Sequence, residues 1–242
     1  MDPPPLIFNS ITKHTATVIF LHGLGDTGHG WGDSVSSVFR YDTSLSHVKW
    51  ILPHAPSMSV TANFGMQMPA WFDITHFDFE TAEDEDGMLR TVSSVNRLIS
   101  AEVSSGIEPG RIVIGGFSQG AAMSLLTGLT NERKLGGIVS LSGWLVLRNK
   151  MKAMCSEHAL AMPVFWGHGT ADPLVTFDLG CTSVDFLKTT LGLPATLPDA
   201  LDGATLKGVM FRQYAGLQHG VAPQELDDLK VWLKKILPQD SE

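Results

Sequence analysis

The segment Gly116-Phe117-Ser118-Gln119-Gly120 places one serine between two glycines in the spacing Gly-x-Ser-x-Gly. It follows an apolar run, 111–115, that predicts a buried strand, and it precedes 119–130, which predicts a helix. A sharp strand-to-helix turn strains the backbone of the serine, and flanking side chains would clash there, which favours glycine. Because such a turn presents the hydroxyl at the end of a strand, we expect Ser118 to be a nucleophile. An ordinary tight turn is the alternative, since short patterns of this kind also occur by chance.

A serine hydroxyl is a poor nucleophile at neutral pH and needs a base. His219 follows the predicted strand 209–214, late in the chain. Two other histidines compete for this role. His158 lies in a polar patch with no strand before it, and His168 precedes the expected acid. Because nucleophile-elbow hydrolases have the chain order serine, acid, histidine, we expect His219 to be the base.

The acid of such a group holds the imidazole in one tautomer and stabilises the imidazolium. Asp172 lies in a glycine-containing loop directly after the predicted strand 163–166. Asp178 is a second candidate, but a helix starts near it and an N-terminal cap explains it. We interpret Asp185 as a helix-surface charge. The expected acid is therefore Asp172.

The remaining requirement is a pair of N–H donors for a developing oxyanion. One is the backbone N–H after the nucleophile, which belongs to Gln119, and the other comes from a loop after an early strand. The glycine-rich segment 20–28 follows the predicted strand 17–21, and we expect Leu24 to be the second donor. A phosphate-binding loop would need a Gly-Lys-Ser/Thr ending, which Asp26-Thr27 contradicts.

These residues all lie near the ends of predicted strands, and strands alternate with helices along the chain. That alternation predicts a mostly parallel central sheet with helices on both faces. Together with the nucleophile motif it predicts an α/β-hydrolase fold in one domain, 1–242. Parallel sheets place ligand sites at the carboxyl ends of their strands. The expected strands are 17–21, 49–52, 111–115, 137–141, 163–166 and 209–214, and the expected helices are 88–103, 119–130 and one beginning at Pro223.

The chain has 242 residues, a hydrophobic fraction of 43% and a formal net charge of −8, so a large core is expected and nucleic acid is not an expected partner. Cys155 and Cys181 are too few for a disulfide framework, and we expect free thiols. The start, 1–5, has no signal-peptide pattern, and no stretch is apolar enough to span a membrane, which predicts a cytoplasmic protein. Without a cysteine pair or a helical His-x-x-x-His, we expect no metal or cofactor.

Several longer segments add to the nucleophile motif: 21–31, 53–56, 68–73, 115–120, 141–145 and 168–175. Through them the chain resembles the acyl-protein thioesterases of the phospholipase/carboxylesterase family. The resemblance implies Ser118, Asp172 and His219 as a triad, with Leu24 and Gln119 as the oxyanion hole. It also implies removal of long acyl chains from cysteines of acylated proteins or peptides. A general carboxylesterase or lysophospholipase is the alternative, and a binding protein on a hydrolase scaffold is a third possibility.

A long acyl chain needs apolar surface near the nucleophile, because each buried methylene contributes about 0.8 kcal/mol. The segment 57–69 is uncharged and contains three methionines, which suit a flexible ligand. Membrane contact is expected to be transient and apolar, since the net charge is negative and the near-terminal cysteine acylated in some relatives is absent. The segment Leu191–Lys207 is longer than in that family and its role is open. The expected acyl-binding residues are Phe64, Met66, Trp71, Phe72, Ile74, Trp144 and Leu174.

Overall fold

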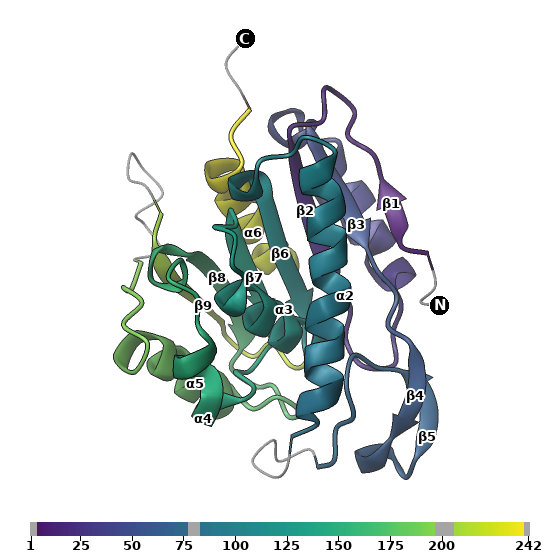
Figure 1. Cartoon of the computed structure of the whole chain (residues 1–242), viewed down its shortest axis with the longest axis vertical. Helices are drawn as coiled ribbons and strands as arrows, with labels where there is room; N and C mark the ends of the chain where they lie inside the picture. Colours follow the sequence, from purple (N-terminus) through teal and green to yellow (C-terminus); the bar gives the residue numbers. More distant parts are fainter. Residues whose placement is uncertain (1–3, 77–82, 197–205, 240–242) are drawn as a thin grey trace.

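The centre of the protein is a seven-stranded sheet with the order β1-β3-β2-β6-β7-β8-β9 (Figure 1). A computed structural model describes residues 4–76, 83–196 and 206–239. Among the described ladders of this sheet, β1 alone runs antiparallel to its neighbour. The predicted mostly parallel sheet is therefore confirmed. The strands are β1 (Leu6–Phe8), β2 (Ala16–Leu21), β3 (Val48–Leu52), β6 (Ile112–Phe117), β7 (Gly137–Leu141), β8 (Pro163–Gly169) and β9 (Gly208–Tyr214).

All six predicted strands are present, and β1 is an additional strand that the sequence pattern does not predict. A strand of three residues carries too little pattern to distinguish it from a loop. The predicted strands appear in the sequence as continuous apolar runs because both faces of the sheet are covered. In β2, Ala16, Val18 and Phe20 join one buried cluster, whereas Ile19 and Leu21 join the cluster on the opposite face.

The two faces of the sheet are covered by different helices (Figure 1). One face packs against α2 (Glu85–Ser104), α3 (Gln119–Thr130), α4 (Arg148–Met154) and α5 (Phe177–Thr189). The other packs against α6 (Pro223–Ile236) and η2 (Val35–Arg40), which continues directly from α1 (Gly32–Ser34). Further single turns are η1 (Gly28–Trp31), η3 (Thr43–Leu45), η4 (Thr61–Asn63), η5 (Pro109–Arg111) and η6 (Ala159–Ala161).

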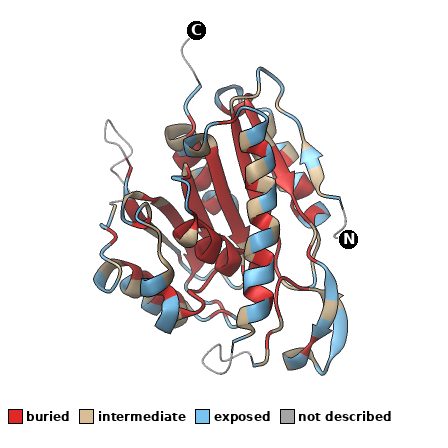
Figure 2. Ribbon diagram, viewed as in Figure 1, coloured by how far each residue is buried: buried red, intermediate tan, exposed pale blue. Residues whose placement is uncertain are grey.

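The three predicted helices correspond to α2, α3 and α6. The α2 pattern is amphipathic, and Figure 2 shows the result: one side of α2 is buried against the sheet and the other is exposed. Asp84 caps α2 by accepting a hydrogen bond from the backbone N–H of Gly87 at 2.9 Å. In α3 the first eleven residues are all buried, so this helix lies at the centre of the molecule.

A two-stranded hairpin, β4 (Ser57–Val60) and β5 (Met66–Pro69), forms a separate small sheet. Met58 pairs with Met68 in its antiparallel register. Most of the hairpin is exposed, and it lies beside the N-terminal end of α2 (Figure 2). The sequence analysis predicts an apolar lining for this segment and no strands, although Ser57-Met58-Ser59-Val60 and Met66-Gln67-Met68 alternate between polar and apolar residues over these short runs.

Several further sequence predictions concern the chain outside the central sheet. Cys155 and Cys181 are free thiols, as expected. Within the described residues, no helix has both the length and the apolar character needed to span a membrane. Of the segment Leu191–Lys207, the structure describes 191–196 and 206–207, and Ala195 forms a parallel bridge with Val209. The rest of that segment lies outside the described residues.

Candidate active site

Ser118 occupies the sharp turn between β6 and α3. Its backbone adopts φ 53° and ψ −120°, a conformation that side-chain-bearing residues rarely adopt. A Cβ on Gly116 would overlap the backbone of Gly120, and a Cβ on Gly120 would overlap the backbone of Leu21. The two glycines are therefore required by close backbone packing, as the sequence pattern indicated.

The loops after β6, β8 and β9 bring Ser118, Asp172 and His219 together. His219 Nε2 lies 2.9 Å from Ser118 Oγ, and His219 Nδ1 lies 2.7 Å from Asp172 Oδ2. A carboxylate can only accept, so Nδ1 carries the imidazole proton and donates it to Asp172. The lone pair on Nε2 then faces the Ser118 hydroxyl. The ring of Phe117 supports this arrangement, with its centroid 4.9 Å from that of His219.

Asp172 is held from two sides. Its Oδ1 accepts hydrogen bonds from the backbone N–H groups of Leu174 at 2.9 Å and Val175 at 3.0 Å. These bonds leave Oδ2 directed at His219. The residue is 5% exposed, so water does not compete strongly for the carboxylate.

His168, which the chain order excludes as the base, lies directly behind Asp172. Its Nε2 is 2.8 Å from the carbonyl oxygen of Val175 and 3.7 Å from Asp172 Oδ2. Its Nδ1 accepts a long hydrogen bond, 3.4 Å, from the Trp166 indole N–H. Burial lowers the pKa of His168, so the ring is neutral and donates from Nε2. Sequence reasoning missed this supporting role: His168 lies near the end of β8, directly before the loop that carries Asp172.

His158 and Asp185 take no part in the triad. His158 is near Glu157, with 3.8 Å between its Nε2 and the carboxylate. Asp185 is a surface charge on α5, as expected, 4.0 Å from Lys188.

The interpretation of Asp178 as a helix cap is wrong. The cap of α5 is Thr176, whose side chain accepts a hydrogen bond from the Leu179 N–H, and Asp178 lies in the first turn. A hydroxyl one residue before the helix can reach that N–H, whereas a side chain inside the first turn points outwards.

The loop after β2 lies against the nucleophile. A Cβ on Gly23 would be 3.5 Å from Ser118 Cβ, so Leu24 follows a residue in close contact with the serine. The Gly25 N–H donates to the Pro69 carbonyl at 2.8 Å, which fixes the loop. Gln119 is the first residue of α3, and the first N–H groups of a helix have no acceptor within it. Gln119 directly follows Ser118 and Leu24 directly follows Gly23, so both expected oxyanion donors belong to segments next to the nucleophile.

The side chain of Gln119 has a second function that the sequence did not indicate. Its Oε1 accepts from the Trp71 N–H at 3.0 Å and its Nε2 donates to the Phe72 carbonyl at 2.8 Å. The Trp71 indole N–H donates to the His22 carbonyl at 2.7 Å, and His22 Nε2 accepts from the Ala55 N–H at 3.0 Å. These bonds connect the nucleophile turn, the 22–28 loop and the 53–56 loop into one rigid unit.

The seven expected acyl-binding residues fall into two groups. Four are buried and belong to the same apolar cluster, namely Trp71, Phe72, Ile74 and Trp144. Three are exposed: Phe64 by 96%, Met66 by 53% and Leu174 by 57%. Of the seven, Leu174 combines exposure with a hydrogen bond to Asp172. Among the residues that the structure describes, no group of three or more His, Cys, Asp or Glu side chains is arranged to hold a metal ion.

Comparisons with known proteins identify the family of this chain. The family model described as Phospholipase/Carboxylesterase matches residues 3–237. Acyl-protein thioesterase 1 of Cryptococcus neoformans var. neoformans serotype D is 52% identical over 229 residues, covering 93% of each chain. Acyl-protein thioesterase 1 of Neurospora crassa is 43% identical, covering 98% of this chain and 93% of the relative.

Solved structures show the same fold. The crystal structure of Arabidopsis thaliana SOBER1 has 32% sequence identity and a TM-score of 0.82, covering 92% of this chain and 99% of that one. Zea mays acyl-protein thioesterase 2 has 29% identity and a TM-score of 0.81, covering 96% of this chain and 98% of that one. With the family match extending over nearly the whole chain, this protein belongs to the phospholipase/carboxylesterase family of α/β-hydrolases.

Proposed function

We propose that this protein hydrolyses long-chain acyl thioesters on the cysteines of acylated proteins, through an acyl-enzyme formed on Ser118. The observation that carries the proposal is the pair of contacts made by His219, at 2.9 Å to Ser118 Oγ and 2.7 Å to Asp172 Oδ2. In this arrangement a hydroxyl, a base and an orienting acid are connected in the order that nucleophilic catalysis needs.

In the acylation step, Ser118 Oγ attacks the thioester carbonyl carbon while His219 Nε2 takes the hydroxyl proton. The carbonyl oxygen gains negative charge, and the N–H groups of Leu24 and Gln119 stabilise it. Asp172 stabilises the imidazolium that forms. Collapse of the tetrahedral intermediate breaks the carbon–sulfur bond, and the cysteine sulfur leaves as a thiol after receiving the proton from His219.

In the deacylation step, water replaces the thiol. His219 Nε2 takes a proton from the water as its oxygen attacks the acyl carbon of the Ser118 ester. The second intermediate collapses by breaking the bond to Ser118 Oγ, which recovers the proton from His219. The products are a fatty acid and the free enzyme, and no cofactor enters the balance.

The substrate class is inferred from the relatives, which are named acyl-protein thioesterases at 43–52% identity over nearly the full chain. For the acyl chain, Leu174 offers exposed apolar surface beside Asp172, and Phe64 and Met66 offer more on the hairpin. The latter two also supply apolar groups for brief contact with the membranes in which acylated proteins reside.

Hydrolysis of oxoesters, as in a carboxylesterase or lysophospholipase, is the second candidate. The matched family is described as Phospholipase/Carboxylesterase, and the same machinery attacks both kinds of ester. A thioester and an oxoester differ in the leaving atom, which the contacts around Ser118 do not distinguish. The two activities are therefore separated by the substrate and not by the mechanism.

Labelling with a serine-reactive fluorophosphonate tests the nucleophile. We expect wild type to be labelled, and Ser118→Ala to lose both labelling and nearly all turnover, with kcat lower by roughly 10⁶-fold as for nucleophile removal in other serine hydrolases. Ser124→Ala is a matched control, because Ser124 is a buried serine of α3 whose hydroxyl donates to the Gly120 carbonyl. Labelling of Ser118→Ala would contradict the assignment of the nucleophile, whereas a wild-type protein that is not labelled would favour a binding protein on a hydrolase scaffold.

A matched series of thioesters and oxoesters with increasing acyl length tests the substrate class. We expect kcat/KM to rise with chain length, and to be higher for acyl-cysteine peptides than for oxoesters of the same acyl group. Release of the free peptide thiol can be followed with a thiol reagent. Higher kcat/KM for oxoesters throughout the series would make the protein a carboxylesterase.

A further inference from the structure

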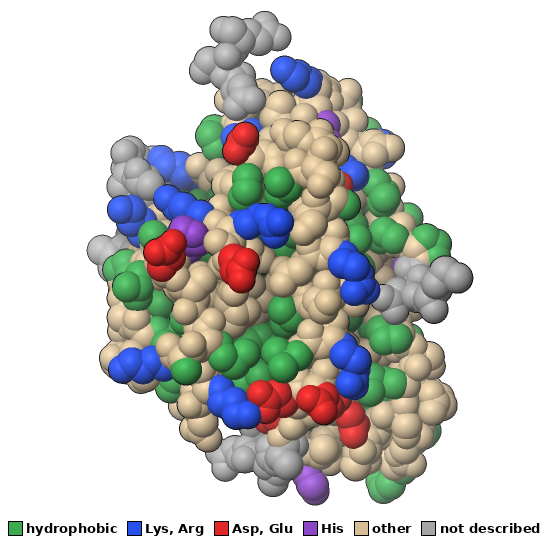
Figure 3. Space-filling view, viewed as in Figure 1, with side chains coloured by type: hydrophobic (Ala, Val, Ile, Leu, Met, Phe, Trp, Pro, Cys, Tyr) green, Lys and Arg blue, Asp and Glu red, His purple; other side chains and the backbone are tan. Residues whose placement is uncertain are grey.

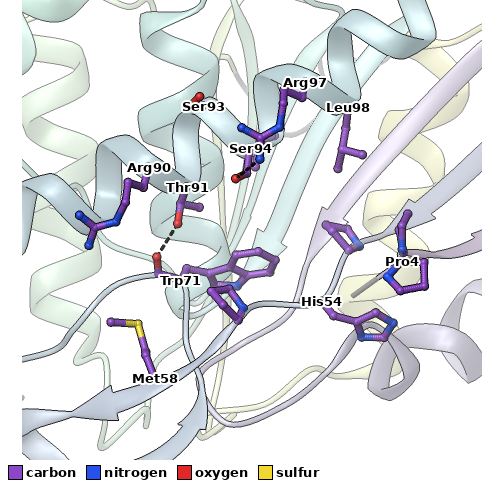
Figure 4. A pocket seen from close by; sticks show the side chains of 15 residues that line it. Pro4, His54, Met58, Trp71, Arg90, Thr91, Ser93, Ser94, Arg97 and Leu98 are labelled. Carbon is purple, nitrogen blue, oxygen red and sulfur yellow. Dashed lines mark hydrogen bonds between the residues drawn. The ribbon is translucent and has the colours of Figure 1, made fainter. Parts of the chain in front are cut away.

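A groove with a volume of about 700 Å³ lies between α2 and the 53–58 segment. Its lining comes from three parts of the chain: α2, the 53–58 segment with Trp71, and the N-terminal prolines Pro4 and Pro5. In Figure 4 the α2 side chains lie on one side, Trp71 forms the floor, and His54 and Pro4 lie on the other side. Ser118, Asp172, His219 and Leu24 do not line it.

The described residues that line the groove carry positive charge, opposite in sign to the net charge of the chain. The chain carries a formal net charge of −8, yet among the described residues that line the groove none is acidic and two are arginines, Arg90 and Arg97. Seven residues apart on α2, they lie two helical turns from each other on one side of the helix. Figure 3 shows basic and hydrophobic side chains along this side of α2, with acidic side chains gathered near its N-terminal end.

His54 adds a polar group and no positive charge. Its Nδ1 accepts a hydrogen bond from the Gly28 N–H at 3.0 Å. Burial lowers its pKa, and the neighbouring His29 lowers it further, so the ring is neutral near pH 7. Arg97 donates to Ser94 Oγ at 2.8 Å, which orients its guanidinium along the helix. The positive charge of the groove is thus that of the two arginines.

The remaining walls are apolar. Met58 and Leu98 are partly buried, Trp71 is buried with its indole N–H already bonded to the His22 carbonyl, and Pro53 and Pro56 add rings. A cavity of this size is typical of small-molecule sites, which combine apolar walls with a few polar groups. An alkyl chain fits such walls, and arginine is well suited to a carboxylate or phosphate.

We propose that this groove is a second ligand site, which binds a single-chain amphiphile with an anionic head, the head at Arg90 and Arg97 and the chain against Met58, Leu98 and Trp71. The ligand chemistry has two sources, a free fatty acid or a lipid phosphate. Binding in the groove does not depend on the proposed acyl-enzyme chemistry at Ser118. The groove and the active site are nevertheless neighbours, because Trp71 lines the groove and also forms hydrogen bonds with Gln119 and His22.

Binding is measured on protein whose Ser118 has been blocked with a long-chain fluorophosphonate, so that the acyl site is filled. Calorimetric titrations use dodecanoate, dodecyl phosphate and the neutral monododecanoylglycerol, each below its critical micelle concentration. Ser118→Ala is titrated in parallel. If labelling fails, the proposed function is in doubt, while the groove is still tested by the Ser118→Ala protein.

The variants separate the groove from general electrostatics. Arg90→Gln with Arg97→Gln removes its two charges, and Leu98→Gln makes its apolar wall polar. Arg133→Gln with Lys134→Gln is the matched control, since it removes the same charge from exposed residues that do not line the groove. We expect one anionic amphiphile per blocked chain, with affinity on the order of 10-fold weaker in the double arginine variant and unchanged in the control.

Tighter binding of dodecanoate identifies a free fatty acid as the source, tighter binding of dodecyl phosphate identifies a lipid phosphate, and either result supports the site. Loss of all binding after Ser118 is blocked would overturn the proposal. Equal binding of the neutral lipid, or equal weakening in the Arg133/Lys134 control, would do the same. Displacement of dodecanoate by a soluble glutamate-rich peptide at similar concentration would show that the groove recognises acidic peptides instead.

Discussion

The loops at the carboxyl ends of the strands and the β4–β5 hairpin differ in which kind of side chain they bury and which they expose. In the loops, Ser118 and Asp172 are 9% and 5% exposed, and His219 contacts both through hydrogen bonds. In the hairpin, Phe64 is 96% exposed and adopts a left-handed backbone with φ 56°. The loops hold polar groups in a dry, bonded arrangement, whereas the hairpin holds apolar groups in water.

This difference explains why one set of sequence predictions is more specific than the other. Hydrogen bonds are directional, so a serine, an acid and a histidine that follow parallel strands can meet in few ways. Apolar contact is non-directional and scales with area, so a run of methionines and aromatics fits a channel, a core or an exposed hairpin equally well. Four of the seven expected acyl-binding residues are therefore found in the core and three on the surface, a division that their apolar character alone does not predict.

The largest effect on kcat in this comparison is expected in the hydrogen-bonded loops, for Asp172→Asn. An amide at this position donates as well as accepts, so it favours the wrong imidazole tautomer. By analogy with a serine protease triad, we expect kcat to fall about 10⁴-fold. Asp185→Asn is the control, because that carboxylate is exposed on α5. Steady-state kinetics on a soluble acetyl ester measures the change, and near-normal turnover would show that another acid orients His219.

Glu225 lies in the first turn of α6, shortly after His219 in the chain. Its titration tests how far water is excluded from this region. Burial raises the pKa of this fully buried carboxyl to about 8 from 4.5. Between these pH values the folded chain keeps a proton that the unfolded chain has released. The free energy of unfolding therefore falls as pH rises from about 5 to about 8, and it does not change further for this group above that range.

Glu225→Gln removes this dependence, because an amide does not titrate. We expect the variant to be more stable than wild type at pH 8 by roughly 2–4 kcal/mol, and to be similar to wild type at pH 4.5. Denaturant unfolding at several pH values measures it. Asp227→Asn on the same helix is the control, since its side chain is 62% exposed. A pH slope unchanged in Glu225→Gln would contradict the buried, protonated carboxyl.

Within the loops, His168 is expected to affect catalysis by positioning Asp172, without contacting the substrate. Its Nε2–H donates to the Val175 carbonyl, which fixes the turn whose N–H groups hold Asp172. We expect His168→Leu to lower kcat by roughly 10²-fold with little change in KM, because small displacements of catalytic groups are costly. In His168→Gln the amide N–H can replace Nε2–H and should restore part of kcat.

The matched pair separates positioning from stability. Both variants are compared by kcat, KM and thermal unfolding. Equal kcat for the two, with only their stabilities differing, would make His168 a core residue without influence on Asp172.

The smallest effect is expected in the exposed β4–β5 hairpin, for Phe64→Asp. The free energy of unfolding should change by less than about 0.5 kcal/mol, because the ring is in water. If the ring contacts one or two methylenes of the substrate, kcat/KM for long acyl chains should fall up to about 15-fold and that for acetyl esters should not change. Trp144 is 3% exposed, so the corresponding Trp144→Asp would bury a carboxylate and unfold the protein.

Val231→Asp is the control for Phe64→Asp, because it adds the same charge at an exposed apolar position on α6. The measurement is kcat/KM across the acyl series in both variants. Equal losses for acetyl and long-chain esters would show that the hairpin supports the fold and that the acyl chain lies elsewhere, for example at Leu174.

The sequence alone determined the order of the six parallel strands and of helices α2, α3 and α6, and it indicated that Ser118, Asp172 and His219 follow strands. Continuous apolar runs of four to six residues indicate strands covered on both faces, and such strands pair in parallel with helices between them. Parallel strands end at one edge of the sheet, so residues far apart in the chain converge there. Local pattern was sufficient because each of these features depends on near neighbours in the sequence.

Only the tertiary structure decided which apolar side chains are buried, and which polar ones support the site. Trp71 and Phe64 lie in the same uncharged region of the sequence, yet one forms hydrogen bonds to His22 and Gln119 and the other points into water. Chain order excludes His168 as the base, yet its ring lies against Asp172. Burial and second contacts depend on what other segments pack against a residue, and that information is not local to the chain.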